Sequence, residues 1–162
     1  MLETHKPQQQ GFTLPELMTV LAVLAILAMV VVPGLSGFIH SNQATAAANN
    51  LLNQLQLTRS EAVKRSALVT LCHSSNQETC TEDSAWAGYL LLRSADQVVS
   101  VVELAPSTSI TATPAIKNVG FNSVGAATQA VTFLVQREDK CFDVELQLNG
   151  RADVRRRSCP NV

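Results

Sequence analysis

The feature that most constrains this fold is a long apolar run near the N-terminus with a carboxylate at its edge. Residues 17–32 are apolar except for Thr19, and Glu16 stands directly before them. A carboxylate at the edge of a membrane segment is costly unless it finds a partner. We therefore expect Glu16 to meet a positive charge, because an isolated carboxyl group there would take up a proton.

Two simpler explanations of the apolar run do not account for the sequence. A cleaved secretory signal would need a shorter core and a small-residue cleavage site soon after it. The nearest such site, at Ala44 and Ala46, lies well beyond the run. A permanent membrane anchor would explain the hydrophobicity but would leave Glu16 unexplained.

The residues before the apolar run carry a specific motif. Residues 11–16 read G-F-T-L-P-E, which resembles the prepilin signature of type IV pilins and type II secretion pseudopilins. The resemblance implies that a prepilin peptidase cuts after Gly11 and methylates the new N-terminus at Phe12. It also implies that Glu16 meets the N-terminus of a neighbouring subunit during filament assembly. Pro15 departs from the usual aliphatic residue, but proline is tolerated in the first turn of a helix.

The pattern predicts one long helix from Thr13 to about Ala67, roughly 80 Å in length. Residues 17–32 alone would span about 24 Å, short of the ~30 Å hydrocarbon core, so we expect the membrane segment to continue to Ile39. Pro33 removes a backbone hydrogen bond and should kink or locally melt the helix. In the resembling family a proline here loosens as the subunit leaves the membrane; a simple membrane-helix kink is the alternative.

Beyond Pro33 the helix becomes amphipathic, with apolar residues at three- and four-residue steps. Residues 54–65, Q-L-Q-L-T-R-S-E-A-V-K-R, resemble the "LxxLxxARSEAIKR" run of GspH/FimT-type minor pilins. We therefore expect a cleaved leader at 1–11, a transmembrane and assembly half of the helix at 12–39, an amphipathic half at 40–66, and a periplasmic head at 67–162.

The head has the alternating pattern of strands separated by turn-rich stretches. The expected strands are 67–72, 86–93, 98–104, 109–113, 130–136, 141–148 and 152–159, with turns at 74–84, 105–107 and 118–128. A long helix followed only by strands predicts an α+β fold, in which an antiparallel sheet packs on the upper half of the helix.

Four cysteines lie in the head, and their spacing matches no metal or redox motif. Behind a membrane segment they indicate an oxidising periplasm and two disulfides. Four cysteines allow three pairings. Closing the loop after the first strand is a common pattern in the resembling family, and we favour Cys72 with Cys80 and Cys141 with Cys159.

The C-terminal hairpin has a register that side-chain parity restricts. A two-residue turn at Asn149 and Gly150 would place Leu146 opposite Asp153 and the two cysteines on opposite faces. A three-residue loop, residues 149–151, places Leu146 opposite Val154 and Cys141 opposite Cys159. It also pairs Glu145 with Arg155 and Asp143 with Arg157. A loop at residues 148–150 keeps the parity but sets the cysteines diagonally, which suits a disulfide less well.

The same hairpin carries candidate DNA-binding residues. Some GspH/FimT-type minor pilins bind DNA through a G-R-x-R motif, which this chain matches at Gly150 and Arg151 but not at Asp153. Arg155, Arg156 and Arg157 would replace the missing arginine, because guanidinium groups suit phosphate. Against this, Asp143 and Glu145 would neutralise two of these arginines, and no neighbouring aromatic residue could stack bases. Further basic residues that could extend the patch are Lys64, Arg65, Lys117 and Lys140.

Charge and residue types then limit the function. From residue 59 onward the chain has 11 basic and 11 acidic residues, which argues against a uniformly basic nucleic-acid coat. His5, His40 and His73 form no catalytic triad or metal-ligand spacing, so we expect no enzyme activity, metal or cofactor.

We expect a minor pilin of a type IV pilus, near the tip, with a candidate role in DNA uptake. The alternative is a GspH-type minor pseudopilin of a type II secretion system. The implied partners are a prepilin peptidase, other pilins or pseudopilins, the inner membrane before assembly, and double-stranded DNA. The implied location is the inner membrane, crossed once with the head in the periplasm, and then the assembled filament.

Overall fold

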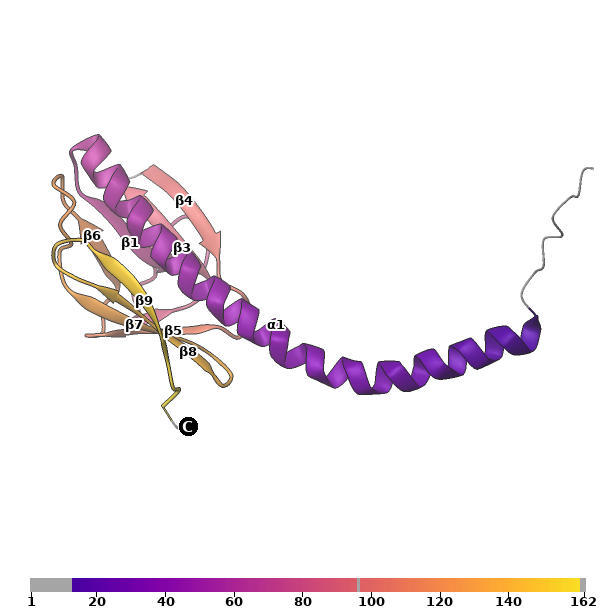
Figure 1. Ribbon diagram of the computed structural model, residues 1–162. Helices are drawn as coiled ribbons and strands as arrows, with labels where there is room; N and C mark the ends of the chain where they lie inside the picture. The colour runs from indigo at the N-terminus through magenta and orange to yellow at the C-terminus, as the bar shows by residue number, and fades with distance from the viewer. Residues whose placement is uncertain (1–12, 96, 161–162) are drawn as a thin grey trace, which may run out of the picture. The chain divides into compact units, whose positions relative to one another are not determined.

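The fold begins with one long helix, which the computed structural model places before a β-rich head (Figure 1). The structure describes residues 13–95 and 97–160, and for residues 30–40 it describes the backbone alone. Within these limits the chain forms two compact units, one reaching Phe38 and the other starting at Ile39. The second half of the helix therefore belongs to the same unit as the head.

Helix α1 spans Leu14–Arg65 and is 52 residues long. An acidic residue in its first turn, Glu16, and basic residues in its last turn, Lys64 and Arg65, complement the helix dipole. The helix ends because Ser66 takes a left-handed conformation, with φ of 50°. The Ser66 N–H then bonds to the Val63 carbonyl and the Ala67 N–H to the Ala62 carbonyl, each at 3.2 Å, which is the Schellman arrangement.

The prediction of a helix through Pro33 is correct, and of the two effects expected there, a kink or local melting, local melting is absent. The backbone of α1 is helical without a break across Pro33 and Gly34.

The head contains two antiparallel sheets (Figure 1). The first has the order β4-β3-β1-β6 and the second β2-β5-β7-β8-β9. The strands of the first sheet are β1 (Val69–Ser74), β3 (Tyr89–Ser94), β4 (Gln97–Glu103) and β6 (Asn118–Phe121). Those of the second are β2 (Ala85–Trp86), β5 (Ser109–Thr113), β7 (Val131–Arg137), β8 (Lys140–Leu146) and β9 (Ala152–Arg157). The α+β class is confirmed.

One hydrophobic core joins the helix to both sheets. Leu51 and Leu55 of α1 are fully buried in the same cluster as Leu71 of β1 and Phe133 of β7. Trp86 packs edge-on against Phe133 with ring centroids 4.9 Å apart. The head therefore needs the amphipathic half of α1 to cover its sheets.

The predicted strand at 86–93 is wrong as a single element. Trp86 belongs to β2 and pairs with Ile110 in the second sheet, whereas β3 starts at Tyr89 in the first. Gly88, with φ of 77°, makes the change of direction between them. The backbone of Gly88 passes so close to the Ser74 carbonyl that an added Cβ would lie 2.7 Å from its oxygen, so only glycine fits there.

Strand β6 lies within residues 118–128, where the sequence pattern predicts a turn-rich stretch and no strand. Val119, Gly120 and Phe121 are all buried, so β6 lacks the alternation that marks a half-buried strand. It pairs with β1, placing Phe121 opposite Val69 and Asn118 opposite Cys72.

The predicted hairpin register has the right parity but is shifted by two residues. Val144 pairs with Val154, Leu146 with Ala152, and Cys141 with Arg157. The Gln147 N–H also bonds to the Arg151 carbonyl at 2.9 Å. The turn is therefore residues 148–150, the alternative in which the two cysteines are not opposite each other. Leu148 lies in this turn and is 60% exposed.

Both disulfides in the structure are the expected pairs, Cys72–Cys80 and Cys141–Cys159. Cys141 and Cys159 are not opposite each other in the ladder, yet their Cα atoms are only 5.1 Å apart. Cys159 lies two residues past the end of β9, so its backbone is free of the ladder and can approach Cys141.

Candidate functional site

The predicted assembly residue Glu16 lies at the start of α1. Its carboxylate accepts hydrogen bonds from the Thr13 backbone N–H at 3.4 Å and from the Thr13 hydroxyl at 3.3 Å. An acidic residue three positions after a threonine cap stabilises a helix start in this way. Gly11 and Phe12, the predicted cleavage and methylation residues, lie outside the described residues.

The first turns of α1 present an apolar surface. Their large apolar side chains are between 48% and 78% exposed in the isolated chain. They are Leu14, Leu17, Met18, Val20, Leu21, Val23, Leu24, Ile26, Leu27 and Met29. A contiguous exposed surface of this kind marks a contact with membrane or with other protein.

The predicted membrane segment extends into residues 30–40, whose side chains lie outside the described part of the chain. Among the residues that are described, no helix is both long enough and apolar enough to cross a bilayer.

The arginines of the C-terminal hairpin lie on two faces of β9. Arg155 and Arg157 share a face with Asp143 and Glu145, because side chains alternate along a strand. Arg157 lies 3.4 Å from Asp143, and Arg155 lies 3.7 Å from Glu145. These are the two ion pairs expected from the sequence, but the observed register makes both contacts diagonal.

Arg151 and Arg156 are placed differently. The Arg151 guanidinium contacts Asp153 through Nε at 3.0 Å and through a second nitrogen at 3.4 Å. Arg156 is opposite Phe142, on the other face of β9. Three arginines and three carboxylates thus occupy the outer face of this hairpin, so the predicted DNA-binding residues do not form one basic surface.

Arg151 instead contributes to an open groove of about 620 Å³ beside the end of α1. The groove is lined by one face of the helix and by the turn into β9. Its lining residues are Gln56, Arg59, Ser60, Val63, Lys64, Gly150, Arg151 and Ala152. We call it the basic groove, because Arg59, Lys64 and Arg151 all line it.

Two glycines lie close to the Arg59 side chain, which lines the basic groove. Gly125 and Gly150 have φ of 79° and 78°, and a Cβ added to either would lie 3.0–3.1 Å from the Arg59 Nε. A Cβ on Gly150 would also lie only 2.0 Å from the Gly125 carbonyl oxygen. The Ala127 N–H donates to the Leu148 carbonyl at 3.0 Å, which fixes the two turns together.

Arg59 could not be recognised as a site residue from the sequence. It lies in the helical run that resembles that of minor pilins, but the two glycines beside it come from distant loops. Among the described residues Arg59 has no ion-pair partner.

Of the four basic residues predicted to extend the DNA-binding patch, only Lys64 lines the basic groove among the described residues. Lys64 lines the groove and lies 3.5 Å from Glu61, whose carboxylate also accepts from Arg65 at 2.7 Å. This Arg65 hydrogen bond is the main cause that lowers the pKa of Glu61. Lys117 instead pairs with Glu82 at 2.9 Å, and Lys140 with Asp139 at 2.6 Å.

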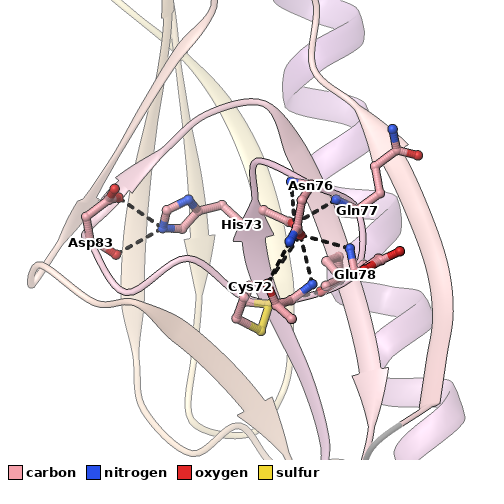
Figure 2. Close-up of a disulfide and its surroundings, with 10 residues drawn as sticks. Cys72, His73, Asn76, Gln77, Glu78 and Asp83 are labelled. Carbon is pink, nitrogen blue, oxygen red and sulfur yellow. Dashed lines mark hydrogen bonds and ion pairs between the residues drawn. A yellow bond between two sulfur atoms is a disulfide. The ribbon is translucent and has the colours of Figure 1, made fainter.

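The loop after β1 is a second organised surface. Its disulfide joins Cys72 to Cys80, and the Asn76 side chain accepts from the N–H groups of Glu78 and Thr79 at 3.0 Å (Figure 2). The buried His73 ring contacts the Asp83 carbonyl at 2.9 Å and its carboxylate at 3.3 Å (Figure 2). The histidine, which belongs to β1, therefore ties that strand to the loop. In the described part of the chain, no three His, Cys, Asp or Glu residues come together as a metal site would require.

Comparison with known proteins gives two family matches. Residues 47–150 match the model described as type II transport protein GspH, and residues 6–32 match the prokaryotic N-terminal methylation motif. No curated protein matches the chain.

Several solved structures have a similar fold. One is the type IV minor pilin FimU of Pseudomonas aeruginosa, with a TM-score of 0.60 and 18% identity over 73% of this chain and 92% of that one. A second crystal form of FimU gives 0.54 and 18%, over 68% and 91%. The minor pseudopilin EpsH of the Vibrio cholerae type 2 secretion system gives 0.47 and 14%, over 72% and 97%. At these identities the likeness to FimU shows the fold.

Proposed function

The chain belongs to the GspH family of type II transport proteins, and we propose from this that it is a minor subunit of a pilin-type filament. The single observation that carries the proposal is the methylation motif at residues 6–32, followed in the same chain by a pilin-like head. The helix would hold the subunit in the filament, and the head would lie exposed on the filament surface. A prepilin peptidase and other pilin-type subunits are the corresponding partners.

The mechanism of assembly follows from the first turns of α1. Their exposed apolar side chains need a covering layer, which the inner membrane provides before assembly and neighbouring helices provide afterwards. Glu16 is satisfied locally by Thr13. In the filament it would instead meet the methylated amine of Phe12 on the next subunit, and this charge pairing sets the register between helices. Pro33 is the proposed point at which the helix loosens during this transfer.

The test uses Glu16→Leu in the native host. We expect the variant to be cleaved after Gly11 and to remain in the membrane fraction, but to be absent from isolated filaments. Thr19→Val, a nearby polar-to-apolar change, should assemble normally. Normal incorporation of Glu16→Leu would remove Glu16 from the mechanism.

For the type of filament, we propose a minor pilin near the tip of a type IV pilus. The fold that this chain shares with the type IV minor pilin FimU supports the pilus part of this proposal. The second candidate is a minor pseudopilin of a type II secretion system, which the description of the matching family model favours. Deletion of the gene separates the two, because loss of pili with normal secretion supports the first, and loss of secretion with normal pili supports the second.

We further propose that a pilus subunit of this kind contacts double-stranded DNA through its C-terminal arginines. Arg151, Arg155 and Arg157 are exposed, and exposed ion pairs are worth about 1 kcal/mol or less, so phosphate could replace their carboxylate partners. Arg156 would add a fourth cation from the opposite face of β9. Binding should be independent of sequence and weaken steeply with salt. Arg151→Gln with Arg155→Gln should abolish the shift of a duplex, while Lys117→Gln should not; unchanged binding would exclude the hairpin.

A further inference from the structure

The head carries two surfaces of opposite charge that the assembly mechanism above does not use. One is the basic groove, and the other is the loop of residues 75–84, which we call the acidic loop. We propose that the basic groove binds the acidic loop of a second copy of this chain. The proposal rests on the proposed function, since it names a contact between heads in the filament.

The basic groove has unused positive charge. Arg59, Lys64 and Arg151 line it, whereas the carboxylates nearby are Glu61, which contacts Lys64, and Asp153, which contacts Arg151. Lys64 and Arg151 keep 75% and 69% of their side-chain surface exposed. Arg59 has no carboxylate partner among the described residues, and its side chain passes close to Gly125 and Gly150. An incoming carboxylate would therefore meet an unpaired guanidinium, the preferred donor for that group.

The acidic loop has the complementary charge and little freedom to lose. Its acidic residues are Glu78, Glu82 and Asp83. Among the lysines and arginines of the described structure, Lys117 lies within ion-pair distance of Glu82, while Asp83 contacts the buried His73. Glu82 keeps 89% of its side chain exposed despite this contact. The disulfide and the Asn76 hydrogen bonds fix the backbone (Figure 2). Because the loop is already ordered, binding would cost less conformational entropy than binding of a flexible segment.

The two surfaces lie at opposite ends of one sheet. Strand β1 starts at Val69, four residues after α1 ends, and runs to Ser74, where the acidic loop begins. At ~3.3 Å per residue this separates them by roughly 17 Å along the strand. Phe121, at the end of β6, pairs with Val69 and leads into the turn that holds Gly125. A contact between different patches on identical units repeats from one copy to the next, and it builds an open line of subunits unless the rotation between copies closes a ring.

The groove suits a protein segment better than a nucleic acid. Val63 and Ala152 supply apolar wall between the cations, whereas a groove that follows a phosphate backbone is lined with positive charge and, for single strands, aromatic side chains. Nucleic acid is therefore an outcome that the experiment must exclude.

The test exchanges charge between the two surfaces in the mature full-length chain, purified in nonionic detergent. The groove variant is Arg59→Glu with Arg151→Glu, and the loop variant is Glu78→Lys with Glu82→Lys. Sedimentation should show that the wild-type chain self-associates and that added salt weakens this association. Each variant alone should associate at least about tenfold more weakly, because like charges now oppose each other. An equimolar mixture of the two should regain association.

Two controls keep the result interpretable. Arg155→Glu with Arg157→Glu makes the same change in net charge outside the groove and should associate as the wild type does. Arg59→Gln removes one cation without adding a repulsive charge and should give an intermediate loss with an unchanged circular dichroism spectrum.

Three results would overturn the proposal. They are failure of the mixture to associate, equal loss in the control with Arg155 and Arg157 changed, and duplex DNA binding that only the groove variant loses while the wild-type chain stays monomeric. Failure of the filament function itself would appear separately, as an unprocessed N-terminus and absence from filaments.

Discussion

Replacing Gly150 with alanine tests the close approach of the Gly125 and Gly150 turns beside the basic groove. Gly150 has φ of 78°, and its added Cβ would lie 2.0 Å from the Gly125 carbonyl oxygen. The left-handed conformation costs a non-glycine residue about 1–2 kcal/mol, and forcing atoms into a filled site costs about 1–3 kcal/mol more. We therefore expect Gly150→Ala to lower the free energy of unfolding by about 2–5 kcal/mol.

The assay is thermal unfolding followed by circular dichroism. For a head of this size the loss corresponds to a fall in Tm of roughly 8–20 °C. Gly150→Asn separates the two causes, because asparagine tolerates the left-handed conformation but keeps the Cβ; it should retain most of the steric part. Val124→Ala, in the neighbouring turn and exposed, is the matched control and should unfold as the wild type does. A Tm for Gly150→Ala within 2 °C of the wild type, taken as roughly 0.5 kcal/mol, would refute the close approach of the two turns.

Two further predictions concern the core and the acidic loop. The buried Trp86 Nε1 donates to the Ile116 carbonyl at 2.8 Å, so Trp86→Phe should cost about 1–3 kcal/mol through the unsatisfied carbonyl, measured by chemical denaturation; an unchanged midpoint would contradict this. The Lys117 hydrogen bond lowers the pKa of Glu82, so its small stabilisation is present at neutral pH and is lost as the pH falls through that lowered pKa. Lys117→Met should return the Glu82 pKa towards its ordinary value in an NMR titration, and an unmoved pKa would show that the pair does not form.

The long helix and the strand pattern could be predicted because each follows from local chemistry. The apolar run beside Glu16 and the amphipathic stripe beyond it depend only on nearby residues. Strand β6 could not be predicted in this way, because Val119, Gly120 and Phe121 are all buried and show no alternation.

The hairpin shows the limit of parity arguments. Parity excludes a shift of one residue but does not distinguish registers two residues apart. The choice between them was made by assuming that Cys141 and Cys159 face each other inside the ladder. Cys159 in fact lies beyond the end of β9, where the backbone no longer follows the ladder.

The candidate site residues also differ in whether the sequence alone could predict them. The prepilin motif consists of consecutive residues, so Glu16 could be proposed as an assembly residue from the sequence alone. Arg59 could not, because Gly125 and Gly150 reach it from loops more than sixty residues away in the chain. Contacts of this kind are created by the tertiary fold.

The most direct test of the account is the intact mass of the chain isolated from filaments of its native host. The account predicts a chain that begins at Phe12, carries one added methyl group on its N-terminus and retains both disulfides. A chain that still begins at Met1, or that is cleaved at another position, would contradict assembly through the Glu16 motif.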